Sequence, residues 1–529
     1  GGAARSGGGN PPGHAAGVRP EAPPGPVDVL EAARRRGVPG DRVLVLAPAS
    51  ERVDGESGPE QGRAAASGPS VEEGGSRAER PASWRALELE ALDAAVERRA
   101  RALREGTAAL PGSVPGAGRI VPRVVRTDLD GLLDLLALWR LGAVPAPLNP
   151  RLPPAEEVRA RAELAGRPGG GAQVVLWTSG TSGRPRGVAL GWPGIEAHVD
   201  AVVRRLELQP EADLWAATLA PAHVGGFMLQ LRALLTGTPL VVPPARDAAA
   251  LARLLEGPVR AAGFERPVTH LSLVPTQLLR LLEARGERPA PPGLRCVLLG
   301  GAHTPRELLD RALGAGWPVA LTWGMTEMGS QVATAPPAEV ARKPGSVGRP
   351  LDGVEVEVGP DEELRVRGPG LARACLDGTP LLDDAGWYHT GDLGHIDEGG
   401  ALRITGRRFD RIVSGGVTVD AREVEETLRA HPSVAAACVA GVPDPEWGEV
   451  VGAWIEPVAG EFDPEEVDRW LRRRLAGPKL PRRWVVGDAL PLNPNGKVDR
   501  AAVRARLART SGGGRRGGRG GRARGAEGG

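Results

Sequence analysis

The sequence has 529 residues, 41% of them hydrophobic, and a formal net charge of only +2. A chain of this length can bury a large core and is expected to form two to four domains. Because the net charge is close to zero, no global field draws the protein to nucleic acid or to a membrane. The three cysteines stand far apart without metal-ligand spacing, which gives no sign of a metal cluster and fits a reducing cytosol.

The sequence also bears on the cellular setting. It contains no run of about 18 apolar residues, and it begins with Gly and Pro rather than an apolar signal, so we expect a cytoplasmic protein that is neither secreted nor inserted in a membrane. Only three of the 67 basic residues are lysines, namely Lys343, Lys479 and Lys497. Where arginine has so largely replaced lysine, a surviving lysine is a candidate for chemistry that arginine cannot supply, although three survivors also fit chance.

Low-complexity stretches delimit the folded parts of the chain. Residues 1–26 are rich in Gly, Pro and Ala, and we expect a disordered N-terminus there. Residues 51–82 are rich in Gly, Glu and Ser and predict an insertion within a folded domain, while residues 511–529 form an Arg- and Gly-rich tail that we expect to be disordered. The remainder predicts a large domain over 27–405 and a smaller one over 406–510.

Hydrophobic spacing predicts the elements of the large domain. Helices are predicted over 84–105, 132–141, 245–256 and 275–285, and a strand over 143–148. Further strands are predicted at the apolar runs "VVLW", "DLWAATLA", "PLVVP", "VTHLSLVP", "LRCVLLGG" and "WPVALTWG". This alternation predicts an α/β fold with largely parallel sheets, whose binding sites lie at the carboxyl ends of the strands. The texture after Gly406, with "DAREVEETLRAHP" and "VAAACVAGVPD", predicts a smaller α+β unit.

A polar loop, "WTSGTSGRPRG" at 177–187, joins two apolar runs that together predict a hairpin. It lacks the strand-to-helix passage and the Gly-Lys-Ser/Thr ending of a Walker loop. Its glycines still let an anion approach the backbone, and its hydroxyls and two arginines can bind phosphate oxygens. The loop therefore favours an oligophosphate ligand, against the alternative of a flexible surface hairpin.

Two polar clusters follow predicted strands. "LLGGAHTP" (298–305) holds paired glycines that would let a flat base pass closely, or would only make a tight turn. "LTWGMTEMGSQ" (321–331) offers an aromatic face at Trp323, a hydroxyl at Thr326 and a carboxylate at Glu327. These groups suit a stacked base, a phosphate and Mg²⁺, unless Trp323 is a core residue and Glu327 a solvated helix start.

A third cluster, "WYHTGDLGHID" at 387–397, places Asp392 between two glycines. A carboxylate in such a place can accept hydrogen bonds from both ribose hydroxyls, as acids do in nucleotide sites. The alternative is an ordinary Asx turn.

Five motifs in a fixed order resemble a known superfamily. "TSGTSGRPRGV", "GMTE", "YHTGDLG", "GRRFDRIVSGG" and "NGKVDR" are similar to those of adenylate-forming enzymes, which include acyl-CoA synthetases, carrier-loading adenylation domains and luciferases. The resemblance spans about residues 28–505; each motif is weak singly, but five in order make coincidence improbable. It implies a large N-terminal domain of several subdomains, a small mobile C-terminal domain, and the use of ATP, Mg²⁺ and coenzyme A.

The resemblance implies a role for each matching position. The loop that binds the β and γ phosphates comprises Thr178, Ser179, Gly180, Thr181, Ser182, Gly183 and Arg186, although the family usually has Lys where Arg186 stands. The adenine pocket comprises Gly300, Gly301, Ala302, Trp323 and Gly324, with Trp323 stacking on the base. Thr326 binds the α-phosphate, Glu327 ligates Mg²⁺, and Asp392 with Arg407 holds the ribose. His223 gates the acyl pocket, unless it is a packed structural histidine.

The resemblance also implies roles in the small domain. Lys497 bridges the carboxylate and the α-phosphate during adenylate formation, a task that suits a compact ammonium better than a planar guanidinium. A hinge lies at about 407–410, and because Phe409 replaces the family's usual polar residue, the residue that turns is left open. Ser414, Gly415 and Gly416 line the pantetheine tunnel after the small domain has rotated.

The choice of substrate rests on finer similarity. "GMTEMGSQVAT" and "KPGSVGRPL" are most similar to 2-succinylbenzoate–CoA ligases of menaquinone biosynthesis. A medium-chain fatty or aromatic acid–CoA ligase and a carrier-loading adenylation enzyme remain as alternatives, while an RNA-associated binding protein is disfavoured by the complete catalytic set. We therefore expect an AMP-forming acid–thiol ligase acting on a carboxylic acid, ATP and CoA, with no nucleic-acid partner and no integral membrane association, and we leave a homodimer open.

Overall fold

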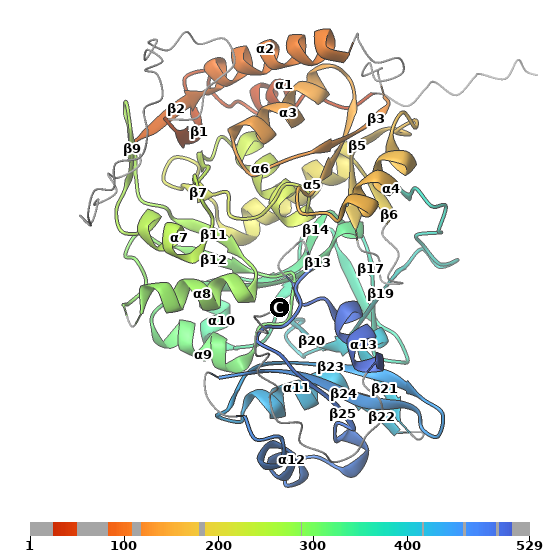
Figure 1. The fold of residues 1–529 in the computed structure, drawn as a ribbon. Helices are drawn as coiled ribbons and strands as arrows, with labels where there is room; N and C mark the ends of the chain where they lie inside the picture. Colours follow the sequence, from red (N-terminus) through yellow and green to blue (C-terminus); the bar gives the residue numbers. More distant parts are fainter. Residues whose placement is uncertain are drawn as a thin grey trace, which may run out of the picture.

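The protein is represented by a computed structural model, which describes residues 25–49, 83–107, 118–178, 186–286, 288–414, 417–458, 462–493 and 497–509. These residues form a large domain and a smaller one that lies at one end of it (Figure 1). The predicted α/β fold class is confirmed. The low-complexity segments predicted at 51–82 and 511–529, and most of the one at 1–26, lie outside the described residues.

A nine-stranded sheet with a parallel centre organises the large domain. Its strands, in spatial order, are β15 (Arg349–Pro350), β14 (Ser330–Ala335), β13 (Val319–Met325), β12 (Cys296–Leu299), β11 (His270–Leu273), β7 (Trp215–Ala216), β8 (Leu240–Val241), β1 (Val43–Pro48) and β2 (Trp84–Glu88). The strands from β13 to β1 pair in parallel, and antiparallel strands close both edges. A parallel centre must be covered on both faces by its crossover helices.

The two faces of this sheet bury two separate hydrophobic clusters. Val45 and Leu298 belong to one cluster and their chain neighbours Leu46 and Leu299 to the other, because successive side chains of a strand point to opposite faces. The helices of the first cluster are α1 (Val29–Arg35), α2 (Leu89–Thr107), α3 (Leu129–Arg140), α5 (Trp192–Leu206) and α6 (Val224–Thr236). Those of the second are α7 (Ala248–Leu254), α8 (Pro275–Arg285), α9 (Arg306–Gly314) and α10 (Pro337–Arg342). No described helix is long and apolar enough to pass through a bilayer.

Smaller sheets complete the large domain. They comprise β5 (Ala172–Thr178), β6 (Arg186–Gly191) and β18 (Ala374–Cys375); β16 (Glu355–Val358), β17 (Glu363–Arg367), β19 (Tyr388–Ile396) and β20 (Leu402–Arg407); β3 (Ile120–Val124) with β4 (Val144–Leu148), next to α4 (Pro154–Leu164); and β9 (Val259–Ala261) with β10 (Phe264–Arg266). β5 pairs antiparallel with β6. The hairpin predicted on either side of the polar loop is therefore confirmed.

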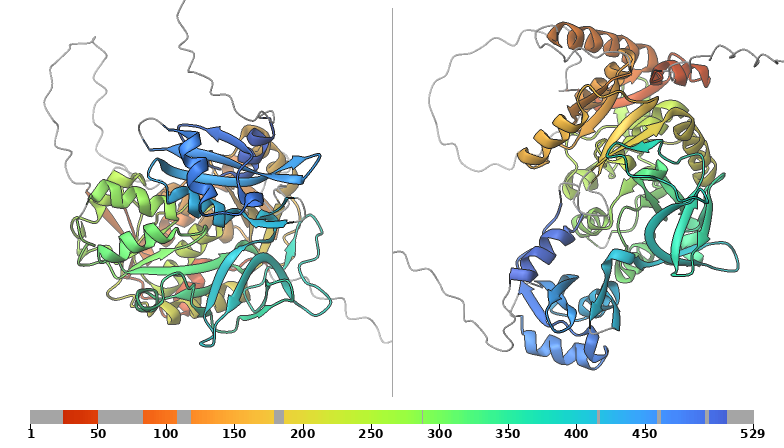
Figure 2. Two further views of the ribbon diagram at one scale, coloured as in Figure 1. Left: turned by 90° about the horizontal axis from the view of Figure 1, so that it is seen from below. Right: turned by 90° about the vertical axis from the view of Figure 1, so that its right-hand side faces the viewer.

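The small domain begins after a short 3-10 helix, η2 (Arg408–Asp410). It contains β21 (Arg411–Ser414), β22 (Val417–Asp420), β23 (Val434–Asp444), β24 (Gly448–Pro457), β25 (Arg483–Val486), α11 (Ala421–Arg429), α12 (Pro464–Arg472), η3 (Gly477–Lys479) and α13 (Arg500–Arg509). α11 and α12 pack on one face of its sheet, and α13 packs on the other. The views in Figure 2 show this α+β unit as a body of its own beside the large domain.

One predicted helix begins later than the sequence suggested. Residues 84–88 of the helix predicted over 84–105 form β2, which pairs antiparallel with β1, and α2 starts only at Leu89. Trp84, Ala86 and Leu87 fit either periodicity over so short a run, and pairing with the sheet edge decides between them. The helix predicted over 275–285 is confirmed to the residue, with Pro275 in its first turn and Gly286 after its end.

The three cysteines are buried and unpaired. Burial raises the pKa of all three thiols, that of Cys296 and that of Cys438 to about 12. They are therefore thiols rather than thiolates at neutral pH and are poor nucleophiles.

Candidate active site

The predicted nucleotide-site residues gather where β12 and β13 end, close to the small domain (Figure 1). Gly300 follows β12, and η1 (Thr326–Met328) follows β13. Gly300 lies against β13, since a Cβ added there would be 2.6 Å from the Cγ2 atom of Thr322 in that strand. At Gly324 a Cβ would lie 1.8 Å from the Ser330 carbonyl oxygen, so the β13–β14 hairpin itself requires a glycine there.

Asp392 lies at the centre of this site. Its side chain is only 4% exposed, and each carboxylate oxygen accepts one hydrogen bond, from the Trp323 indole N–H at 2.8 Å and from the Arg407 Nε–H at 2.7 Å. A buried carboxylate needs such partners to offset its desolvation. The carboxylate raises the pKa of Arg407 in turn. The structure thus brings together Asp392 and Arg407, the pair predicted to hold a ribose.

Trp323 occupies a more buried place than a stacking residue needs. Its side chain is 7% exposed and packs with Met328, Leu364 and Tyr388 in a hydrophobic cluster. Most of the Trp323 ring therefore lies in the core, as the alternative interpretation of this residue predicted. Its indole N–H donates to Asp392 and orients that carboxylate. Stacking of this ring on adenine stays a prediction.

Glu327 and Arg186, two of the predicted site residues, form an ion pair. The Arg186 Nη2 atom donates to the Glu327 carboxylate at 2.8 Å, and both side chains are largely buried. The pKa of Arg186 is raised by this hydrogen bond in spite of burial, and burial together with the Glu327 charge raises the pKa of Tyr388. Arg186 was predicted to bind phosphate and Glu327 to ligate Mg²⁺, but the ion pair between them was not predicted.

Lys497 reaches this site from the small domain. A Cβ at Gly301 would lie 3.2 Å from the Lys497 Cε atom and 3.3 Å from Nζ. The Lys497 amide and carbonyl are both hydrogen-bonded to Asn493, at 3.1 and 2.7 Å. Burial and the positive charge of Arg407 lower the pKa of the Lys497 ammonium to about 8, against the opposing effect of Asp392.

His223 and the loops complete the set of predicted residues. His223 caps the start of α6, and its Nε2 atom lies 3.1 Å from the Asn149 Nδ2 atom. Ala302 is exposed beside Gly301, and Ser414 is buried with its hydroxyl unpartnered among the described residues. The predictions for the side chains of Thr178 and Phe409 fall outside the described structure, as do those for Ser179, Gly180, Thr181, Ser182, Gly183, Gly415 and Gly416.

Arg232 was not anticipated from the sequence. It is 2% exposed on α6, its guanidinium lies 4.5 Å over the Trp215 ring, and it makes no ion pair or side-chain hydrogen bond to any described residue. Burial lowers its pKa to about 10. His198 and Gln230, also buried, each carry a polar atom that has no partner in the described part of the chain. The sequence signal that could have indicated Arg232 is the single arginine in the apolar run "GFMLQLRALL". Because burying an unpaired cation costs free energy, such an arginine is a candidate functional residue.

Comparisons with known proteins decide the family. A family profile described as "AMP-binding enzyme" matches residues 171–374, and one described as "AMP-binding enzyme C-terminal domain" matches residues 423–497. A 2-succinylbenzoate–CoA ligase of Bacillus cereus (strain AH820) is 35% identical over 363 residues, which make up 66% of this chain and 73% of that relative. This chain belongs to the AMP-binding enzyme family.

Solved structures of AMP-binding enzymes share its fold. The o-succinylbenzoate CoA synthetase (MenE) of Bacillus subtilis in complex with the acyl-adenylate intermediate OSB-AMP is 25% identical, with a TM-score of 0.70 over 79% of this chain and 93% of that one. The same enzyme in complex with ATP and a magnesium ion is 25% identical, with a TM-score of 0.68 over 80% and 94% of the two chains. The predicted fold is thus confirmed as that of adenylate-forming enzymes.

The donor set of this AMP-binding enzyme fits Mg²⁺. Magnesium in nucleotide sites is held by one or two carboxylates together with phosphate oxygens and water. Glu327 supplies a carboxylate and the adjacent Thr326 a hydroxyl, at the end of the strand that carries the nucleotide site. Because Arg186 already binds the Glu327 carboxylate, the metal must share or replace that ion pair.

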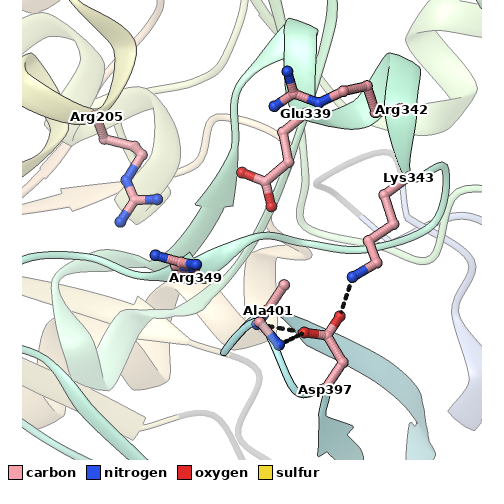
Figure 3. A pocket seen from close by; sticks show the side chains of 8 residues that line it. Arg205, Glu339, Arg342, Lys343, Arg349, Asp397 and Ala401 are labelled. Carbon is pink, nitrogen blue, oxygen red and sulfur yellow. Dashed lines mark hydrogen bonds and ion pairs between the residues drawn. The ribbon is translucent and has the colours of Figure 1, made fainter.

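A separate cavity of about 500 Å³ lies away from this site (Figure 3). It is lined by Arg205, Arg349 and residues of α10, its C-cap and the β19–β20 turn. Among the lining residues, the Lys343 ammonium binds the Asp397 carboxylate at 2.6 Å. None of the predicted site residues lines this cavity.

The lowered pKa of Lys497 can be measured directly, because the chain has only three lysines. After reductive ¹³C-methylation, we expect one dimethyl-lysine NMR resonance to titrate near pH 8, where burial makes the ammonium lose its proton early. The Lys497→Arg variant should lack that resonance, which assigns it. A Lys497 resonance that titrates at the ordinary value of 10.5 would contradict the enclosed position of this ammonium.

Proposed function

We propose that this AMP-binding enzyme is an ATP-dependent carboxylate–CoA ligase that converts 2-succinylbenzoate to 2-succinylbenzoyl-CoA, in menaquinone biosynthesis, through an acyl-adenylate. The observation that carries adenylate formation is the approach of the Lys497 ammonium to Gly301 in the nucleotide site. The substrate is supported by the 35% identity to a ligase of that name and by the fold shared with MenE bound to its acyl-adenylate.

In the first half-reaction a carboxylate oxygen of the acid attacks the α-phosphorus of ATP, the bond to the bridging oxygen breaks, and pyrophosphate leaves with the electron pair. Lys497 lies between the carboxylate and the α-phosphate and stabilises the charge that develops there. The Thr326 hydroxyl donates to the α-phosphate. Held by Glu327, Mg²⁺ supplies positive charge to the phosphate oxygens.

The remaining residues position the nucleotide. Asp392, fixed by Trp323 and Arg407, accepts hydrogen bonds from the ribose hydroxyls. The adenine lies against Trp323, Gly324 and the 300–302 loop. The β and γ phosphates bind the loop of Thr178, Ser179, Gly180, Thr181, Ser182 and Gly183 together with Arg186, whose charge can move from Glu327 to phosphate once the metal binds Glu327.

In the second half-reaction the CoA thiol attacks the acyl carbon, a thioester forms, and AMP leaves. We place the domain boundary, predicted between residues 405 and 406, at the end of β20, and the hinge at 407–410, so that the small domain proper begins with β21. The small domain turns about this hinge and carries Lys497 away from the reacting atoms. Ser414, Gly415 and Gly416 then line the path of the pantetheine arm, and His223 gates the acyl pocket. The enzyme acts in the cytoplasm.

Arg232 distinguishes a diacid from a simple acid. 2-Succinylbenzoate has two carboxylates, of which one is activated and the other stays charged. The buried guanidinium of Arg232, which has no carboxylate partner among the described residues, offers the charge that the second carboxylate needs. It lies on α6, the helix that begins at the proposed gate His223. A medium-chain fatty acid has no group to pair with such a cation.

The reaction and its substrate are tested together by ATP–pyrophosphate exchange. We expect Mg²⁺-dependent exchange that is strongest with 2-succinylbenzoate in a panel with benzoates and medium-chain fatty acids. CoA, and not a holo-carrier protein, should accept the acyl group. Stronger exchange with a fatty acid would overturn the substrate, and no exchange with any acid would overturn the proposed reaction.

Glu327→Gln tests the metal site. The amide keeps the shape of the side chain but removes the charge, so we expect a higher half-saturating Mg²⁺ concentration and slower exchange, by about 10- to 100-fold at limiting metal. Glu339→Gln, a partly buried carboxylate of the separate cavity, is the matched control and should behave as the parent enzyme. Unchanged exchange of Glu327→Gln at limiting Mg²⁺ would make Glu327 only the structural partner of Arg186.

Arg232→Met tests recognition of the second carboxylate. Loss of a charged hydrogen bond should lower kcat/KM for 2-succinylbenzoate by about 10- to 100-fold. For 4-oxo-4-phenylbutanoate, which lacks the ring carboxylate, kcat/KM should hardly change. The melting temperature should not fall, because an apolar side chain of similar length replaces an unpaired buried cation. An equal loss with both acids, or a large loss of stability, would make Arg232 a structural residue.

A further inference from the structure

The small domain meets the nucleotide site of the large domain through polar contacts. Lys497 approaches Gly301, as described above, and the Arg422 Nη1 atom donates to the Ile404 carbonyl at 3.4 Å. Two polar pairs also cross from one domain to the other, the His303–Glu426 hydrogen bond and the Glu362–Arg411 ion pair. None of the four residues of these pairs has a role in the chemistry proposed above.

His303 follows the Gly300–Ala302 loop directly, and Glu426 lies on α11 of the small domain. The His303 Nε2 and Glu426 Oε1 atoms lie 3.2 Å apart, on side chains that are 36% and 50% exposed. The hydrogen bond to His303 lowers the pKa of the Glu426 carboxyl, with smaller contributions from Arg429 and Arg422. The pair therefore joins the loop beside the proposed adenine pocket to the body that carries Lys497.

The second pair lies next to the hinge. The Arg411 Nη2 atom binds the Glu362 carboxylate at 2.8 Å, and Arg411 is the first residue of β21. Glu362 belongs to the turn before β17, and its φ of 65° marks a tight left-handed conformation. The pair therefore spans from the large domain to the first strand of the small domain.

Two residues of the hinge are each tied to one body. Arg408 binds Asp361 and Glu363 of the large domain, each at 3.2 Å. Asp410 binds Arg500 of α13 in the small domain at 3.5 Å. A rotation between these anchored residues moves Glu426 and Arg411 relative to His303 and Glu362, so the arrangement described here and a rotated one differ in both crossing pairs.

We propose that the His303–Glu426 and Glu362–Arg411 pairs form a polar latch that favours the adenylate-forming arrangement of the two domains and opens for the thioester-forming one. This inference rests on the proposed two-step function. The four residues are positioning residues: they touch no substrate and act by setting the population of the arrangement in which Lys497 reaches the site. The latch must be weak, since a strong one would trap the enzyme after the first step.

Exposed ion pairs support such a weak latch. Pairs of this exposure shift an equilibrium by about 0.2–1 kcal/mol, which corresponds to at most about fivefold for each pair. When the equilibrium constant between the two arrangements is close to one, a fivefold change in it raises the population of one arrangement and lowers that of the other. A substitution that only loosens the fold would slow both half-reactions together.

The test measures the two half-reactions separately in Glu426→Gln and Glu362→Gln. One assay is ATP–pyrophosphate exchange with 2-succinylbenzoate, and the other is single-turnover thioester formation from supplied acyl-adenylate and CoA. We expect the ratio of the thioester rate to the exchange rate to rise about two- to fivefold in each variant and further in the double variant. The swapped variant His303→Glu/Glu426→His should restore the parent ratio.

Glu466→Gln provides the matched control. Glu466 lies 3.9 Å from His431, but both residues belong to the small domain, so this His–Glu pair does not cross between the domains. Its removal should leave the ratio of rates unchanged. An unchanged ratio in Glu426→Gln and Glu362→Gln, or an equal fall of both rates, would overturn the latch. The failure of the parent enzyme to perform exchange would instead overturn the proposed function.

A chemical cross-link tests the arrangement itself. In His303→Cys/Glu426→Cys, a short bis-maleimide should join the two domains, while the native thiols are buried with raised pKa and should not react. The cross-linked enzyme should keep exchange and lose thioester formation. Thioester formation that survives in the cross-linked fraction would show that this contact persists through both steps, contrary to the latch.

Discussion

The buried carboxylate of Asp392 is the interaction on which the rest of the site depends. At 4% exposure it is stable only because Trp323 and Arg407 each donate a hydrogen bond to one of its oxygens. Trp323 belongs to β13, the outermost strand of the parallel part of the sheet on this side, and Arg407 is the last residue of β20 before the hinge helix. One desolvated charge thus joins the predicted nucleotide site to the strand that leads into the second domain. Its field also acts on Lys497 across the domain boundary.

Two charged residues of the site form an ion pair with each other that a bound substrate could replace. Arg186 holds Glu327 in the structure described, so the proposed phosphate-binding cation and the proposed metal-binding carboxylate neutralise each other. In the proposed function, binding of a metal nucleotide would replace this one ion pair by two, at little cost in buried unpaired charge. Arg232 differs, because no carboxylate among the described residues pairs with it. In the proposed function, a charged ligand would supply that missing partner and offset the free-energy cost of burying this cation.

Local signals explain what the sequence could predict. α8 was located to the residue because Pro275 and Gly286 delimit an apolar period of helical spacing, and the β5–β6 hairpin because apolar runs flank a polar loop. β2 was predicted as helix, since five residues at a sheet edge are too few for periodicity to decide. The Arg186–Glu327 pair joins residues 141 positions apart and depends on tertiary packing that no local pattern encodes. The only sequence signal for Arg232 was a charged residue within an otherwise apolar run, which forms α6.

The three buried cysteines have a consequence for a protein that handles a thiol. Disulfide exchange requires a thiolate and an accessible sulfur, and burial denies both to Cys296, Cys375 and Cys438. An enzyme with reactive surface thiols would form mixed disulfides with oxidised coenzyme A whenever the cell is under oxidative stress. The described cysteines are shielded from that side reaction, so the proposed acceptor thiol would meet no competing sulfur chemistry from them.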